Sequence, residues 1–192
     1  MKSVCLKLMA TLIAAATFVT AAAPAEAAGP RDEIQVFNGK TQLTSSVVYT
    51  LRIDDDGFRV YIGQHVGPAR PYMVLRNGRV MIGDSDWVIF TLVEKRGQLK
   101  MVRGKSARSR DAMYTVREGQ VFHGNALHRS ALAHELIADR LGDARLCEGG
   151  RRCDRQIFTV RGADLSKDSP DLAAGLLPLL TVLAESEFIP SD

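Results

Sequence analysis

Short runs of β-forming residues, each interrupted by a glycine-containing turn, dominate the middle of this sequence. The stretch YMVLRNGRVMIG places two such runs around Asn77-Gly78, a dipeptide that favours a tight hairpin turn. Three further pairs of runs turn at Asp55-Asp56-Gly57, Arg96-Gly97 and Glu118-Gly119. Consecutive hairpins of this kind give about eight strands whose neighbours in sequence are also neighbours in space. The sequence therefore predicts an antiparallel β-meander, curled into an open sheet or an open barrel.

Two helices are expected in the C-terminal third of the chain. Asn125 is a suitable N-cap for a helix that runs to about Leu141. A second helix is expected to begin near Ser169-Pro170 and to carry a stripe of leucines, with a kink at Pro178. Between the two helices, QIFTV at 156–160 has the composition of one more strand. The predicted fold class is α+β, with the meander covered by the two helices.

The first 27 residues have the pattern of a secretory signal peptide. Lys2 and Lys7 give a positive start, an apolar run follows from Leu8, and Ala25-Glu26-Ala27 is the small-x-small pattern that precedes cleavage. The apolar run is shorter than the roughly 20 residues that cross a bilayer. We expect residues 1–27 to be removed and 28–192 to form a single β-rich domain in the periplasm or outside the cell, with no transmembrane segment.

Two cysteines, Cys147 and Cys153, remain in the expected mature chain. An exported protein enters an oxidising compartment, and the glycines between the two cysteines let the chain turn back on itself. A zinc site would need a second pair of ligands at short spacing, and a redox pair has two intervening residues rather than five. The spacing predicts a disulfide that closes a short loop.

Three stretches that resemble catalytic or ligand-binding motifs fail at required positions. DDDG at 54–57 would need an acidic first calcium ligand where Arg52 stands. RGKS at 103–106 lacks the first glycine of a phosphate-binding loop. HELIA at 134–138 has Ala138 where a zinc protease has its second histidine. We expect neither a metal ion nor a cofactor.

The histidines offer a weaker basis for an enzyme. If 125–141 is helical, His128, Glu135 and Asp139 share its polar face, and His123 at the end of a strand could approach them. A histidine beside carboxylates can act as a general base or bind a metal, although a solvated polar face gives the same pattern. His134 falls on the apolar face and is expected to be a core residue that is hydrogen-bonded to Ser130.

Positive charge is concentrated in one segment although the whole chain has a net charge of only +3. Between 95 and 110 there are seven basic residues and no acidic residue before Asp111. Such a run is either a solvated face or a surface for an anionic partner, such as a lipopolysaccharide phosphate, an acidic glycan, a nucleic acid or an acidic protein. The binding candidates in it are Lys100, Arg103, Lys105, Arg108 and Arg110.

A loop rich in glycine and proline is a second candidate for the rim of a binding site. It spans 63–72 and carries His65, Arg70 and Tyr72, although a plain connection between strands would have the same composition.

Three functions therefore remain open. The first is an exported, non-enzymatic β-scaffold that binds an unidentified partner or ligand, because the catalytic motifs fail. The second is a hydrolase or metal-dependent enzyme that uses His123 or His128 with Glu135 or Asp139. The third is a protein that binds an anionic polymer through the basic segment 95–110.

Overall fold

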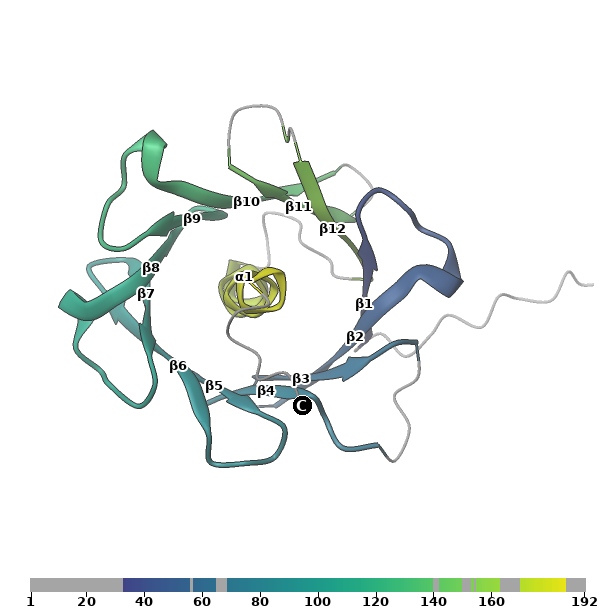
Figure 1. The fold of residues 1–192 in the computed structure, drawn as a ribbon, viewed down its shortest axis with the longest axis horizontal. Coiled ribbons are helices and arrows are strands. Elements are labelled where there is room, and N and C mark those ends of the chain that lie inside the picture. The colour runs from purple at the N-terminus through teal and green to yellow at the C-terminus, as the bar shows by residue number, and fades with distance from the viewer. Residues whose placement is uncertain are drawn as a thin grey trace, which may run out of the picture.

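The fold is a closed β-barrel with a helix inside it (Figure 1). The computed structural model describes residues 33–55, 57–64, 69–139, 142–149, 153, 155–162 and 170–185. The strands are β1 (Glu33–Asn38), β2 (Val47–Asp54), β3 (Gly57–Ile62), β4 (Met73–Arg76), β5 (Arg79–Ile82), β6 (Val88–Lys95), β7 (Gln98–Arg103), β8 (Ala112–Arg117), β9 (Gln120–His123), β10 (Leu132–Ala138), β11 (Ala144–Glu148) and β12 (Arg155–Arg161). Short 3-10 turns, η1 (Thr44–Ser46), η2 (Ser109–Asp111) and η3 (Arg129–Ala131), precede β2, β8 and β10.

The predicted open meander of about eight strands is wrong, because the structure has twelve strands and no free edge. Every strand pairs antiparallel with its neighbours in sequence, and β1 pairs with β12 to close the ring. This closing ladder joins residues that are far apart in the chain, for example Gln35 to Arg161 and Val36 to Val160. Closure satisfies the edge hydrogen bonds that an open sheet would leave exposed.

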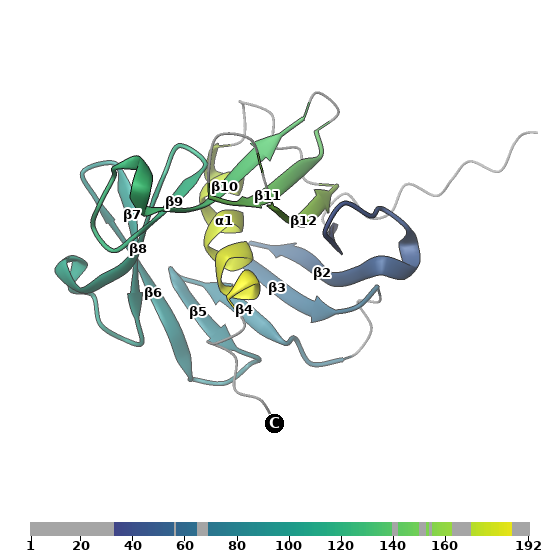
Figure 2. The ribbon, with the colours of Figure 1, turned by 45° about the horizontal axis from the view of Figure 1, so that its top comes forward.

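The helix α1 (Pro170–Ala184) lies inside the barrel rather than over a face of the sheet (Figures 1 and 2). It is apolar on nearly every side, and Leu176, Leu177, Leu179 and Leu180 are all almost fully buried. Inward-pointing residues of the strands, such as Phe90 and Met101, complete one core around it. A helix without a polar face is stable only where protein surrounds it, which accounts for its place in the barrel.

The predicted helix over 125–141 does not form. Its first part is a loop and η3, and its second part is β10, which pairs with β9 on one side and β11 on the other. Two covering helices were predicted, and the described residues contain one α-helix, which begins at Pro170 and includes Pro178 as expected. The four predicted hairpins and the strand near 156–160 are confirmed as β2–β3, β4–β5, β6–β7, β8–β9 and β12.

The barrel consists of five hairpins and the closing pair β12–β1, which no turn joins but which has similar geometry; these six strand pairs are all called hairpins below. Each second strand ends at a glycine with positive φ, and the N–H of that glycine donates to a carbonyl at the start of the first strand at 2.6–2.9 Å. The glycines are Gly39, Gly63, Gly83, Gly104, Gly124 and Gly149. In four of the hairpins a threonine hydroxyl on the first strand also donates to the carbonyl of this glycine; these are Thr50, Thr91, Thr115 and Thr159. The hairpin at Gly39 is made by the two ends of the barrel, β12 and β1.

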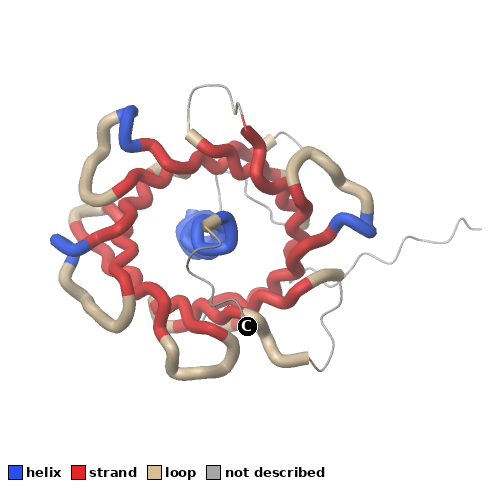
Figure 3. Tube along the Cα trace, in the orientation of Figure 1, coloured by secondary structure: helices blue, strands red, loops and turns tan. Residues whose placement is uncertain are grey.

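Connections of two kinds lie at opposite ends of the barrel. Tight turns join the strands within β2–β3, β4–β5, β6–β7 and β8–β9, whereas longer connections, such as 83–87, 104–111 and 124–131, join successive hairpins and lie outside the barrel wall (Figures 1 and 3). Several outward-pointing side chains near these connections are buried, such as Phe37, Val102 and Phe122. The connections therefore cover parts of the outer wall, and surface pockets form between them and the strands.

The predicted disulfide between Cys147 and Cys153 is confirmed, and it joins the end of β11 to the residues before β12. No helix in the described part of the chain is both long enough and apolar enough to span a membrane.

Candidate functional site: a basic pocket on the barrel wall

The basic segment 95–110 begins at the end of β6, passes through the turn at Arg96-Gly97, follows β7 and continues into η2. Strand alternation sends Leu99 and Met101 into the core, so Lys100 points to the outer wall. The ends of the segment come back together because β6 and β7 form a hairpin and η2 lies beside it. This return brings basic residues that are up to 15 positions apart to one place on the surface.

A pocket of about 250 Å³ lies at this place. Its lining residues are Lys95, Arg96, Gln98, Lys100, Ser109, Arg110 and Asn125. Four of these side chains are basic and none is acidic. The low-dielectric wall behind such a cluster concentrates its positive field at the pocket opening.

Lys100 forms the floor of this basic pocket and is only 6% exposed. Its Nζ donates to Thr115 Oγ1 at 2.8 Å, and Thr115 Oγ1 donates in turn to the carbonyl of Gly124 at 2.6 Å. Because the single hydroxyl proton of Thr115 is used for Gly124, the hydrogen on the first contact must come from the lysine. Buried lysines are normally paired with a carboxylate, and no acidic residue lines this pocket.

The positive charges in the pocket act on one another. Burial lowers the pKa of Lys100, and the nearby charge of Lys95 lowers it further. Lys95 Nζ donates to Ser109 Oγ at 3.0 Å and so joins the β6–β7 turn to η2. An anion between these side chains would compensate the unfavourable interaction of Lys95 with Lys100.

The wall formed by η2 is held in place by the next hairpin. Asn125 Nδ2 donates to the carbonyl of Arg110 at 2.9 Å, which fixes the backbone beneath the Arg110 side chain. The guanidinium of Arg110 is highly exposed and lies 3.7 Å from Asp111, an ion pair that solvent screens. The ion pair with Asp111 therefore neutralises the Arg110 charge only weakly.

Only part of the predicted binding set meets in the basic pocket. Lys100 and Arg110 line it, whereas Arg103, Lys105 and Arg108 are exposed and do not. Arg103 ends β7, and Lys105 and Arg108 lie on the connection that follows. These three side chains add positive charge near the pocket without forming it.

The loop 63–72, the second predicted rim of a binding site, contributes no described residue to the lining of the basic pocket. Arg70 is exposed on the connection between β3 and β4, and the ring of Tyr72 stacks on Tyr49 with centroids 6.2 Å apart and packs against the core. His65 lies outside the described residues.

The arrangement expected for an enzyme depended on a helix that does not form. His128 is exposed before η3, with Nδ1 2.8 Å from Ser130 Oγ, and Asp139 follows the other end of β10. Strand geometry separates these ends by roughly 20 Å. Glu135 accepts a hydrogen bond from Gln120 at 2.9 Å on the outer wall, and His123 ends β9 beside the ring of Tyr114. No group of three or more His, Cys, Asp or Glu in the described ranges is arranged to hold a metal ion.

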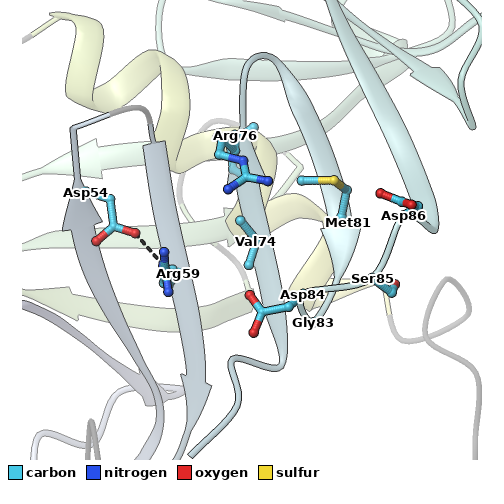
Figure 4. Close-up of a pocket in the computed structure, with 10 residues that line it drawn as sticks. Asp54, Arg59, Val74, Arg76, Met81, Gly83, Asp84, Ser85 and Asp86 are labelled. Carbon is cyan, nitrogen blue, oxygen red and sulfur yellow. Dashed lines mark hydrogen bonds and ion pairs between the residues drawn. The ribbon is translucent and has the colours of Figure 1, made fainter. Parts of the chain in front are cut away.

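A second pocket lies over the hairpins β2–β3 and β4–β5, at the equivalent place in the repeat, but its lining residues carry different charges (Figure 4). Arg59 on β3 corresponds to Lys100 on β7, because both point outward at equivalent positions of their ladders. Asp54 stands where the basic pocket has Lys95, and it pairs with Arg59 at 2.5 Å. Asp84 and Asp86 also line this second pocket. In the second pocket the Asp54 carboxylate therefore neutralises Arg59, whereas Lys100 of the basic pocket has a hydroxyl partner.

Sequence reasoning missed Lys95, Arg96, Ser109, Thr115 and Asn125 as parts of the site. Lys95 and Arg96 were visible within the basic run, but the turn that gathers them with Arg110 was needed to choose them. The sequence predicts Asn125 as a helix cap, but its side-chain amide donates to the Arg110 carbonyl instead. The recurrence of threonine and glycine along the hairpins was the available signal for Thr115.

Comparisons of this chain with protein-family models, with curated proteins and with solved structures found no match.

Proposed function

We propose that this protein binds an anionic polymer through the basic pocket and that it does so without catalysis. The observation that carries this proposal is the buried Lys100, which has a hydroxyl partner but no carboxylate in the pocket. Because buried charges are normally compensated, a bound phosphate, sulfate or carboxylate group is the partner that the site lacks.

The surrounding side chains support a polymer rather than an isolated ion. Arg96 and Arg110 are exposed at the pocket opening and can each hold an oxyanion in a two-pronged geometry. Arg103, Lys105 and Arg108 extend the positive charge beyond the pocket, where further anionic groups of the same polymer would lie. With the predicted signal peptide, an acidic glycan or lipopolysaccharide of the cell envelope is the polymer class that we favour.

Retention on immobilised heparin tests the proposal. The pocket variant carries Lys95→Gln, Arg96→Gln and Arg110→Gln, three exposed side chains whose loss leaves the core intact. The control variant removes the same charge elsewhere on the barrel through Arg52→Gln, Arg79→Gln and Arg145→Gln, which are also exposed. We expect the pocket variant to elute at much lower salt than the control.

The salt dependence separates specific contacts from general attraction. Each neutralised group contributes about 0.7–0.9 to the slope of log affinity against log salt in nucleic acids, so three lost contacts should reduce the slope by about 2. Binding of lipopolysaccharide measured in the same salt series should follow the same order of variants. Equal elution of the pocket and control variants would refute the proposal.

A further inference from the structure

We propose that Lys100 is also a reactive amine, which forms a reversible imine with a small aldehyde or ketone that carries an anionic group. The inference rests on the proposed function, because the same pocket would hold the anionic group. It goes further by assigning a covalent site and a class of ligand.

The hydrogen bonds leave the nitrogen of Lys100 available for reaction. Thr115 Oγ1 gives its proton to the Gly124 carbonyl and therefore can only accept from Lys100. The lone pair of a neutral Lys100 amine is consequently not used by its hydroxyl partner. Since no acidic residue lines the pocket, no carboxylate there holds the nitrogen in its charged form.

The environment makes the neutral amine of Lys100 more accessible than it is for a lysine in solvent; the charged form is the one that a bound anion compensates, and the neutral form is the one that reacts. Lys100 is buried, and the charge of Lys95 opposes a second positive charge nearby; both effects lower the pKa of Lys100. A desolvated lysine beside another cation is the usual form of a carbonyl-reactive lysine. Lys95 lines the same pocket but is exposed, so it offers an internal comparison.

The reaction needs no further reagent. The Lys100 nitrogen forms a bond to the carbonyl carbon, and the two amine hydrogens leave with the carbonyl oxygen as water. The product is a carbon–nitrogen double bond, and no atom is oxidised or reduced. Arg96, Arg110 and Lys95 would hold the anionic group of the ligand and place its carbonyl near Lys100.

Pyridoxal 5′-phosphate is a suitable probe because it joins an aldehyde to a phosphate. The mature protein is incubated with limiting probe, the imine is reduced with borohydride, and modified lysines are located by peptide mass. We expect Lys100 to be labelled about tenfold or more above the exposed Lys40 and Lys105, because the pocket concentrates the anionic probe. Pyridoxal, which lacks the phosphate, should label Lys100 much less.

Several results would overturn the inference. These are labelling of Lys95 at least equal to that of Lys100, even labelling of all lysines, or equal labelling of Lys100 by pyridoxal. Lys100→Arg should remove most of the imine absorbance of the whole protein, and unchanged absorbance would contradict the assignment. The mapping uses the unaltered chain, so the test does not depend on a variant that folds.

The two proposals can fail separately. Heparin retention is measured on unlabelled protein. If the pocket is needed for retention but all lysines are labelled evenly, only the proposal of the imine is refuted. If Lys100 is labelled selectively but the pocket and control variants elute together, only the proposal of polymer binding is refuted.

Discussion

His134 Nε2 lies 3.1 Å from Glu185 Oε1 and so joins strand β10 to the residue that follows helix α1. His134 is only 4% exposed, and its Nδ1 is buried without a hydrogen-bond partner. The sequence correctly places His134 in the core, but its partner is Glu185 and not Ser130. The contact fixes the helix end within the barrel at the end where the long connections lie.

The stability of the barrel should decrease below about pH 6.5 because of His134. Burial lowers the pKa of His134 below its ordinary value of 6.5, although Glu185, Glu148 and His123 also act on it, the two glutamates by raising it. The unfolded chain therefore takes up the proton first, and the stability present above pH 6.5 is lost as the pH falls through the folded-state pKa. Urea unfolding of the wild type and His134→Gln across pH 5–8 measures the effect. A steeper loss in the variant would contradict it.

Substitution of His134 should destabilise the protein much more than substitution of His128. His134→Ala removes a buried side chain and leaves Glu185 without its partner, so we expect a loss of about 2 kcal/mol in the free energy of unfolding. His128 is exposed, and His128→Ala should change it by less than about 0.5 kcal/mol. Chemical denaturation of both variants at pH 7 measures the difference. A larger loss for His128 would show that the burial assigned to these residues is wrong.

Gly175 of α1 should not tolerate a methyl group. A Cβ at this position would lie 2.6 Å from Cε2 of Phe58, a core residue that is 6% exposed. Alanine improves helix propensity by about 1 kcal/mol, but the overpacking should outweigh this and leave Gly175→Ala about 1–2 kcal/mol less stable. Addition of Phe58→Leu should recover part of the loss in a double-mutant cycle. Fully additive losses would mean that the two residues do not touch.

The disulfide should make a modest contribution to stability. A loop of this size predicts about 2 kcal/mol from chain entropy, so the double variant Cys147→Ala, Cys153→Ala should unfold at lower denaturant but still form the barrel. Titration of the non-reduced mature protein should find no free thiol in this pair. Two free thiols per chain would contradict the disulfide.

The signal peptide is a prediction of the sequence that a mass measurement can test. Cleavage after Ala27 leaves the first barrel strand intact, because β1 begins at Glu33. The intact mass of the protein from a periplasmic or culture fraction should therefore correspond to a chain that begins at Ala28. Retention of Met1 to Ala27 in that sample would remove the basis for expecting export.

The sequence predicts local features of this fold well. Hairpins at Asn77-Gly78 and Arg96-Gly97 are confirmed because the turn chemistry and the short flanking strands agree. The region 125–141 was assigned wrongly because its apolar spacing also suits a helix, and only pairing with β9 and β11 makes it a strand. The ring closure between β1 and β12 has no local signal at all.

The sequence predicts that the site is rich in basic residues, but not which of them line the pocket. A run of basic residues indicated where charge would be found, but the hairpin geometry decides that Lys100 and Arg110 share a pocket while Arg103 does not. The sequence also contains a signal for the interior position of α1, but the stripe of leucines suggests a helix with only one buried face. Its sequence is apolar on nearly every side, as a fully surrounded helix requires.

Completion of the barrel by β1 and β12 also constrains when the molecule can fold. Residue pairs such as Gln35 and Arg161 come together only after almost all strands have been synthesised, and the helix that fills the interior follows β12. Early hairpins can form as the chain emerges, but the ring cannot close around its core until the last segment arrives. We therefore expect the closed barrel to form only after α1 has been synthesised, and a shorter nascent chain should lack the packed core.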